Sequence, residues 1–212
     1  MKTKSKEYTA FDSFGFALYA FGGLGMELLL LMAETAVWRN TQQAWTVSQN
    51  MIHWGLTCII WSVIGYYLMR KLPVTADKIN HISWLSVGMV MVISITYTSI
   101  VWDGWKPWIE FTRNGALKFV VQYLYYAFEG LLITLIIAHG QRAFDLWRSK
   151  NAVHPFGGIM LASTWGLIHI FTQGMDTGIY AVVQSLLFGV VYLALKKNFK
   201  LSCLVITIMF MI

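Results

Sequence analysis

The chain has little charge, little proline and little cysteine. Only 12% of its 212 residues are charged, whereas an ordinary soluble domain has about 25%. The two cysteines, Cys58 and Cys203, form no CxxC pair and give no sign of a disulfide framework or a zinc site. The sequence also lacks HExxH, GxSxG and glycine-rich phosphate-loop motifs, and it has no two-histidine metal spacing. We therefore expect neither a metal nor a cofactor.

Long hydrophobic segments are what the chain has in abundance. They occupy residues 11–37, 51–69, 82–102, 115–139, 156–174, 177–195 and 201–212. A helix needs about 20 apolar residues to cross a bilayer, so six segments are long enough. The seventh, with 12 residues, is expected to be a half-span or the stub of a longer one. The sequence predicts an all-α, polytopic transmembrane bundle of six full spans plus this short segment, folded as one domain over residues 1–212.

Basic residues alternate with these segments and orient the bundle. If every long segment crosses the bilayer, 12 of the 16 Lys and Arg residues fall on one side: Lys2, Lys4, Lys6, Arg70, Lys71, Lys78, Arg142, Arg148, Lys150, Lys196, Lys197 and Lys200. Cationic loops are retained in the cytoplasm during insertion, so the N-terminus is expected to be cytoplasmic. The net charge of +6 then reflects topology, and we expect the lipid bilayer, not a nucleic acid, as the partner of this charge. The abundance of Met, Ile and Lys suggests a bacterial cytoplasmic membrane.

Ionisable side chains inside a bilayer are costly, so each needs a partner, a wet cavity or a function. Glu27 lies in the first segment just after Gly22, Gly23 and Gly25. Glycines at such spacing let a neighbouring helix approach closely. These four residues therefore predict a helix-packing site, with a catalytic or transport role for Glu27 as the alternative. Glu34, seven residues later on the same face, is expected to reach the outer headgroups.

A polar stripe runs along the fourth segment. Lys118, Gln122, Tyr125 and Glu129 follow one another at spacings of four, three and four residues, which places them on one face of a helix. Such a stripe would be unstable against lipid, so it should face the bundle interior or an aqueous cleft. Glu129, near the bilayer midplane, could then act as an acid, a base or a proton carrier. The alternative is a neutral carboxyl group that hydrogen-bonds neighbouring helices.

His169 lies near the middle of the fifth segment. A lone buried histidine is more often a packing residue than a ligand, but this one should lie at the depth of Glu129 on an antiparallel neighbour. Glu129 and His169 are therefore the candidate catalytic pair. The candidate cleft-lining residues lie on the same polar faces or on the next segment: Gln122, Tyr125, Trp165, Thr172, Gln173 and Gln184.

Three stretches of the second half carry a family resemblance. They are AHGQRAF at residues 138–144, GGIMLASTWGLIHIF at residues 157–171, and SLLFGVVYLA at residues 185–194 followed by KKN. Residues 115–212 thereby resemble the CPBP family, the membrane-embedded CAAX-protease and bacteriocin-processing group. The resemblance implies a helical core in which Glu and His residues activate a water, in some accounts with a metal, to cleave peptide bonds within the membrane.

Most of the residues that catalyse this reaction do not carry over. If Arg142 is the arginine of the family's Glu-Glu-x-x-x-Arg motif, the glutamate positions are occupied by Ile137 and Ala138. Trp165-x-x-x-His169 fits the Phe-x-x-x-His motif with Trp in place of Phe. The last segment, residues 201–212, contains neither of the His and Asn residues expected there.

The favoured hypothesis is therefore a non-catalytic scaffold that binds a peptide or a partner protein, as an immunity protein or a subunit of a complex. One alternative is an active intramembrane protease that uses Glu129 and His169. The other is a small transporter or channel lined by the polar stripe, although no internal repeat supports it. A protease requires the two groups within about 3–5 Å, directly or through one water. A transporter requires a polar path to both surfaces, and a scaffold requires a cleft open to one side.

Overall fold

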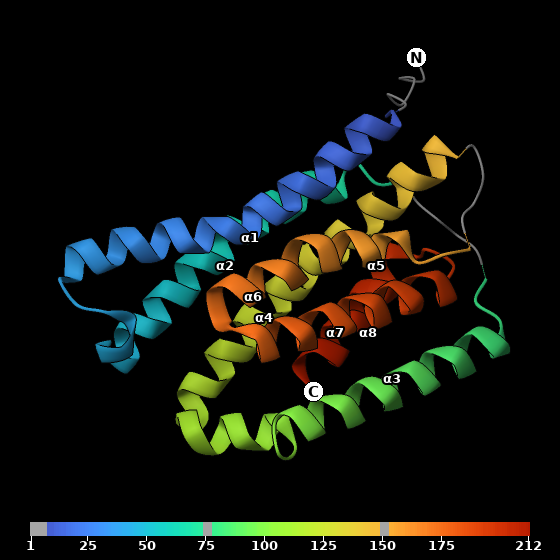
Figure 1. The fold of residues 1–212 in the computed structure, drawn as a ribbon. Helices are drawn as coiled ribbons and strands as arrows, with labels where there is room; N and C mark the ends of the chain where they lie inside the picture. Colours follow the sequence, from blue (N-terminus) through green and yellow to red (C-terminus); the bar gives the residue numbers. More distant parts are fainter. Residues whose placement is uncertain (1–7, 74–77, 149–152) are drawn as a thin grey trace.

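The computed structural model describes residues 8–73, 78–148 and 153–212, and these consist of helices and short connections (Figure 1). The described residues contain no β-strand, so the predicted all-α fold is confirmed. Lys2, Lys4, Lys6 and Lys150, which were counted for the topology, lie outside the described residues.

Within the described residues, five helices are long and apolar enough to cross a membrane. They are α1 (Ala10–Trp38), α2 (Val47–Met69), α3 (His81–Val101), α4 (Lys106–Trp147) and α7 (Met175–Ala194). The fifth hydrophobic segment forms three consecutive pieces: α5 (Phe156–Leu161), the π-helical turn η2 (Ala162–Gly166) and α6 (Leu167–Gln173). The short seventh segment forms α8 (Phe199–Met211), and the turn η1 (Gln42–Ala44) connects α1 to α2. The fifth predicted span is thus built from three helical pieces, and the sixth forms α7.

Polar residues at the helix ends fix where these helices start. The Thr9 hydroxyl accepts a hydrogen bond from the Asp12 N–H at 3.1 Å, and Thr46 caps α2 in the same way. Asn80 caps α3 and Asn198 caps α8. Such caps satisfy backbone N–H groups that have no partner within the helix. Gly174, with φ of 95°, makes the sharp turn from α6 into α7.

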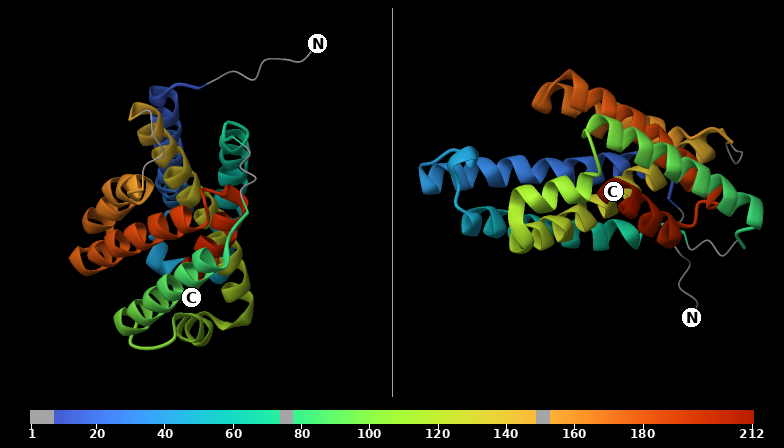
Figure 2. Two further views of the ribbon diagram at one scale, coloured as in Figure 1. Left: turned by 90° about the vertical axis from the view of Figure 1, so that its right-hand side faces the viewer. Right: turned by 90° about the horizontal axis from the view of Figure 1, so that it is seen from below.

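Helix α4 lies at the centre of the bundle. It packs against α1 and α2 on one side and against α5 and α8 on the other (Figures 1 and 2). Its side chains from Leu132 to Ala138 have almost no exposed surface and form the middle of the hydrophobic core. Helix α7 packs against α3 and against the α5–η2–α6 rod, so α3 contacts the bundle mainly through α7. The outward faces of these helices carry many exposed large apolar side chains, as expected of a surface that meets lipid.

Contacts between distant segments bring the predicted cytoplasmic connections together. Arg142 Nη1 donates to the Lys71 carbonyl at 2.9 Å, and Lys197 Nζ lies 2.5 Å from an Asp145 oxygen. The Trp147 ring lies 5.6 Å from the Phe11 ring. We call this the basic end, defined by Arg70–Leu72, Arg142–Arg148 and Lys196–Lys200, and the opposite end the outer end. The connections that the sequence placed on the cytoplasmic side thus lie at the same end of the bundle, in agreement with the alternation of charge along the sequence.

The structure differs from the sequence prediction just before residue 115. That stretch was expected to be a connection, but α4 already begins at Lys106, with Pro107 in its first turn. The helix bends sharply at Gly115, where φ is 71° and ψ is 167°, a conformation that glycine adopts without steric cost. The segment from Lys106 to Asn114 folds back against the bundle and buries Lys106 and Glu110, which are 4% and 0% exposed.

We predict that the crossing of α5 and α7 tolerates no side chain at Gly158. A methyl carbon placed there would lie 2.9 Å from the Gly189 Cα and 2.8 Å from the Ser185 carbonyl oxygen. Gly158→Leu should lower the stability by about 1–3 kcal/mol or more, because the two backbones must separate. Gly88→Leu on α3 is the matched control, since nothing lies within 4 Å of that position. Thermal unfolding in detergent measures both; equal melting temperatures would contradict the crossing.

We predict the orientation of the bundle from the basic end. In a variant whose Cys58 and Cys203 are replaced by alanine, single cysteines at Asn40 or Asp176 should react with a membrane-impermeant maleimide added to intact cells. Cysteines at His154 or Lys200 should react only after permeabilisation, because the basic end is retained in the cytoplasm. Labelling of position 200 from outside the cell would reverse the topology.

Candidate functional site

A cavity of about 970 Å³ opens among α1, α4, α6 and α7 in the outer half of the bundle. This volume is near the upper limit of about 1,000 Å³ for typical ligand pockets. Its aromatic walls come from Phe21, Trp54, Trp102, Trp165 and Phe210. Its polar lining comprises Glu27, Gln42, Lys106, Gln122, Tyr125, Tyr126, Glu129, His169, Thr172, Gln173, Thr177 and Tyr180. The cavity thus combines carboxyl groups with rings.

Most of the residues predicted from the two polar stripes line this cavity. Helix α4 contributes Gln122, Tyr125 and Glu129. The rod of α5, η2 and α6 contributes Trp165, His169, Thr172 and Gln173. Helical periodicity therefore predicted which residues of these two segments line one cavity. Glu129 and Trp165, which are in contact there, lie 36 positions apart in the sequence.

Gln184 lies elsewhere. Its amide is 1% exposed and packs between α7 and α3, where Oε1 accepts from the Ser94 hydroxyl and Nε2 donates to the Thr98 hydroxyl, both at 2.8 Å. The nearby Tyr180 hydroxyl lies 3.1 Å from the same Thr98 oxygen. Gln184 therefore ties α3 to α7 and does not line the cavity, although the sequence predicted that it would.

Glu129 and His169 both contact Trp165. The indole Nε1–H donates to Glu129 Oε1 at 3.1 Å, and His169 Nδ1 donates to the Trp165 carbonyl at 2.6 Å. No hydrogen bond joins Glu129 to His169 in the part of the chain that the structure describes. Trp165 belongs to the π-helical turn η2, a distortion often found at functional sites. The turn thus holds both candidate catalytic groups without pairing them.

The carboxyl group of Glu27 connects three helices. Both of its oxygens lie 2.9 Å from the Tyr125 hydroxyl of α4, and Oε1 lies 3.3 Å from His53 Nε2 of α2. The other nitrogen of His53 lies 2.5 Å from Glu34 Oε2. This bridge requires a proton on both ring nitrogens or on one of the carboxyl groups. Glu34 is therefore buried against His53 and does not extend to the headgroups as the sequence suggested.

The three glycines near Glu27 have different surroundings. Gly23 packs against α2, where its carbonyl accepts from the Trp61 indole at 2.8 Å and an added methyl carbon would lie 3.1 Å from Ile64. A methyl carbon placed at Gly22 or Gly25 would have no neighbouring atom within 4 Å, and both glycines line the cavity. The tight helix packing expected of all three thus occurs at Gly23, whereas the other two leave space.

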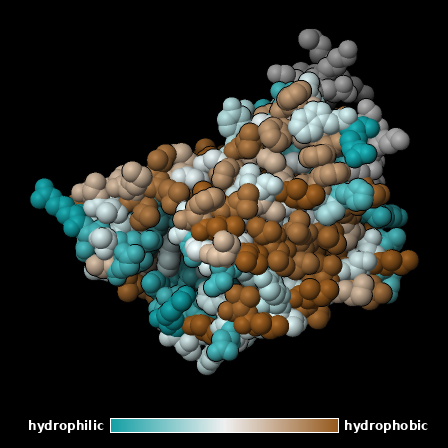
Figure 3. Space-filling view, viewed as in Figure 1, coloured by the Kyte–Doolittle hydropathy of each residue, from teal (hydrophilic) through white to brown (hydrophobic). Residues whose placement is uncertain are grey.

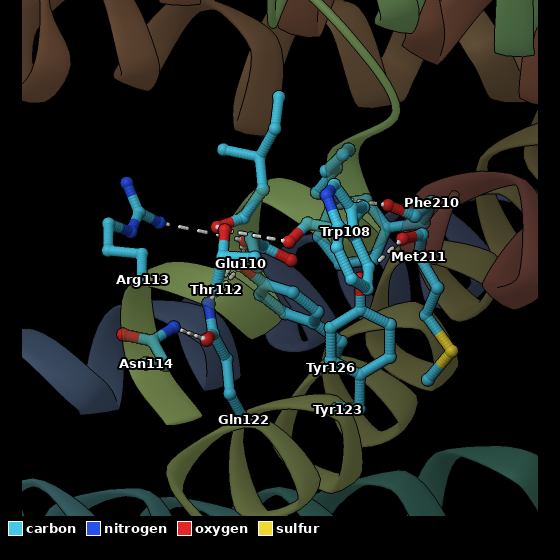
Figure 4. A network of polar contacts seen from close by, with 12 residues as sticks. Trp108, Glu110, Thr112, Arg113, Asn114, Gln122, Tyr123, Tyr126, Phe210 and Met211 are labelled. Atoms are coloured by element: carbon cyan, nitrogen blue, oxygen red, sulfur yellow. Dashed lines mark hydrogen bonds and ion pairs between the residues drawn. The ribbon is translucent and has the colours of Figure 1, made fainter. Parts of the chain in front are cut away.

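A second polar network was missed by the sequence analysis (Figure 4). Glu110 accepts hydrogen bonds from the Tyr126 hydroxyl at 2.7 Å and from Gln122 Nε2 at 3.1 Å, with Arg113 at 4.0 Å. Asn114 Nδ2 donates to Gln122 Oε1 at 2.5 Å, so this amide holds both sides of the Gly115 bend. The i, i+4 spacing of Lys106 and Glu110 just before a glycine was a signal for a buried amphipathic turn.

Lys106 holds the end of α8 against this network. Its ammonium group donates to the Phe210 carbonyl at 2.6 Å and lies 4.8 Å and 4.9 Å from the centres of the Tyr126 and Phe210 rings. Tyr123 donates to the next carbonyl, that of Met211, at 3.1 Å. The last carbonyl groups of a helix have no partner within it, and they favour a nearby cation.

Within the described ranges, no group of three or more His, Cys, Asp or Glu residues is placed to hold a metal ion. Comparison of the chain with models of known families, with curated proteins and with solved structures finds no match. The CPBP resemblance of residues 115–212 therefore stays a prediction.

We predict an energetic coupling between Trp165 and Glu129. Trp165→Phe should lower stability by about 1–3 kcal/mol, because a buried carboxyl group loses its donor. In a double-mutant cycle with Glu129→Leu, unfolding in detergent should give a coupling energy of about 1 kcal/mol or more. His169→Phe with Glu129→Leu is the comparison cycle, and its coupling should be smaller. A larger coupling in the His169 cycle would contradict the observed pairing.

Proposed function

We propose that the chain is a non-catalytic membrane scaffold that binds a peptide, or a segment of a partner protein, in the outer cavity. The observation that carries this proposal is a large cavity whose deepest carboxyl group, Glu129, is held by the Trp165 indole. A carboxyl group fixed in this way can serve as a wall of a binding site. An immunity protein or a subunit of a membrane complex, in a bacterial cytoplasmic membrane, would use such a cavity.

The geometry disfavours an active protease. A water-activating pair needs both groups directed at the same water, with a donor for the developing oxyanion. Here Glu129 and His169 are each engaged by Trp165. The positions where the CPBP resemblance would require glutamates, Ile137 and Ala138, lie in the hydrophobic core with 0% and 1% of their surface exposed. These arrangements support a scaffold over an enzyme.

A transporter or channel is disfavoured by the inner half of α4. One turn beyond Glu129, the side chains of Leu132, Ile133, Leu135 and Ile136 have no exposed surface. They pack with Leu161 and Phe188 into one apolar core between the cavity and the basic end. A conduction path would need polar groups or water through this layer. The cavity therefore has the one-sided form expected of a binding site.

The position of the cavity suits a ligand that approaches from the outer leaflet. Helices α1 and α6 flank it, with Gly22 and Leu28 on one side and Ile168 and Thr172 on the other. Figure 3 shows hydrophilic residues gathered around a recess toward the end of α1, while hydrophobic residues cover much of the rest of this face. An apolar peptide could thus reach the cavity from the lipid or from the outer surface.

A binding selection tests the proposal. The protein, purified in a non-ionic maltoside detergent, is presented with a random library of blocked synthetic decapeptides, and retained peptides are sequenced by mass spectrometry. We expect the wild type to enrich a subset of peptides and to release them intact. Gly25→Leu should bind the enriched peptides at least about tenfold more weakly, because the new side chain occupies the cavity.

Gly88→Leu is the matched control, since both glycines have open space around them and only Gly25 lines the cavity. It should bind as the wild type does. Equal retention by Gly25→Leu would remove the cavity from the proposal. Cleavage of the peptides that is lost in Glu129→Gln would instead establish the protease.

A further inference from the structure

Two carboxyl groups, those of Glu27 and Glu129, line the cavity, and among the described residues the only basic side chain that contacts either of them is His53, beside Glu27. Tyr125 donates to Glu27, and Glu129 follows Tyr125 by one turn on the same face of α4. No Lys or Arg side chain of the described residues lies within 4.0 Å of either carboxyl group. Glu129 is only 9% exposed, and its single hydrogen bond in this structure engages Oε1. Its other oxygen is available to a ligand.

The basic side chain that lines the cavity, Lys106, and the nearby Arg113 are already engaged. The Lys106 ammonium group points to the Phe210 carbonyl, and Arg113 accompanies Glu110. Lys118 lies 5.6 Å from the centre of the Trp54 ring but does not line the cavity.

His53 supplies at most one positive charge, and it shares that charge between Glu27 and Glu34. Among the described residues, neither Glu27 nor Glu129 has a Lys or Arg side chain within 4.0 Å, and a carboxyl group ionises at this depth at low cost only beside a cation. A basic group of a ligand in the cavity would supply that cation.

We infer that the cavity selects a peptide segment with one basic side chain, Lys or Arg, between apolar residues, and that Glu27 and Glu129 receive its cationic group. This inference rests on the proposed function. The Nδ1–H of His169 is donated to a carbonyl, which leaves Nε2 of the neutral ring as an acceptor in the same cavity. The rings of Trp54 and Trp165 provide faces for the alkyl chain and for the cation.

The apolar part of the ligand has a matching surface. The Trp54 ring lies 6.0 Å from the Tyr125 ring, and the Trp165 ring lies 5.9 Å from the Phe210 ring, so the aromatic side chains form continuous walls around the carboxyl groups. Gly22 and Gly25 leave the α1 side open for backbone or small side chains. A purely hydrophilic cation would leave these walls without contacts, which favours an amphipathic segment.

Three blocked decapeptides of otherwise identical, leucine- and alanine-rich sequence test the inference. They carry lysine, norleucine or glutamate at the centre, and their binding to the protein is measured in maltoside detergent. We expect the lysine peptide to bind at least about tenfold more tightly than the norleucine peptide, because charge-assisted hydrogen bonds are the stronger ones. The glutamate peptide should bind more weakly than both.

Glu129→Gln and Glu27→Gln should each reduce the preference for lysine over norleucine to about twofold or less. Asp176→Asn is the matched control: this carboxyl group is exposed near the outer end and does not line the cavity, so the preference should be unchanged. Thermal unfolding is measured alongside, since Glu27 also contacts Tyr125 and His53. A preference lost equally in Asp176→Asn would overturn the role of the two cavity carboxyl groups.

The outcomes separate the two proposals. If the wild type binds the lysine and norleucine peptides equally, and Gly25→Leu binds neither, the charge inference fails while the scaffold stands. If no peptide binds the wild type, the proposed function fails. Binding of butylammonium alone, without binding of any peptide, would identify a small organic cation as the ligand and overturn the peptide inference.

Discussion

Carboxyl groups buried at membrane depth must find donors on a neighbouring helix or across the bend in α4, and this requirement holds the outer half of the bundle together. Glu27 accepts from Tyr125, Glu110 accepts from Tyr126, and Glu129 accepts from Trp165. Each donor is aromatic, so one side chain supplies both an N–H or O–H group and a large apolar surface. Lipid offers no alternative donor, and separation of these pairs would leave a polar group unsatisfied.

The same pairs explain why a cavity persists where the core could have closed. The carboxyl groups hold Tyr125 and Trp165 in place along its walls, and Gly22 and Gly25 remove the side chains that would otherwise fill it. Toward the basic end, the α4 side chains from Leu132 to Ile137 are buried, and all of them except Thr134 belong to one hydrophobic core. The bundle is therefore divided into a closed inner half and an open outer half.

Segment lengths and helical spacing predicted most of the helices, and all but one of the residues predicted to line a cleft do line the cavity, because lipid imposes a fixed span and polar faces must turn away from it. The same reasoning failed for Lys106 and Glu110, whose position in a connection suggested exposure to solvent, although Gly115 turns them back into the bundle. It also failed for Gln184, since a polar residue on an inner face can satisfy a neighbouring helix equally well. Which side chains pair across two helices depends on how each helix is rotated about its own axis. That rotation cannot be read from a single sequence.

Whether a cavity with a buried carboxyl group and a histidine binds a ligand or catalyses a reaction depends on which atoms of these two groups are left without a hydrogen bond. The Trp165 indole donates to one oxygen of Glu129, and the Trp165 carbonyl accepts from Nδ1–H of His169, so a single residue engages both groups. The second oxygen of Glu129 and Nε2 of the neutral His169 ring are then acceptors, and both residues line the cavity. Two acceptors of this kind complement a cation, whereas a developing oxyanion needs donors. On this arrangement we base the proposal that the cavity recognises a basic group and does not hydrolyse a peptide.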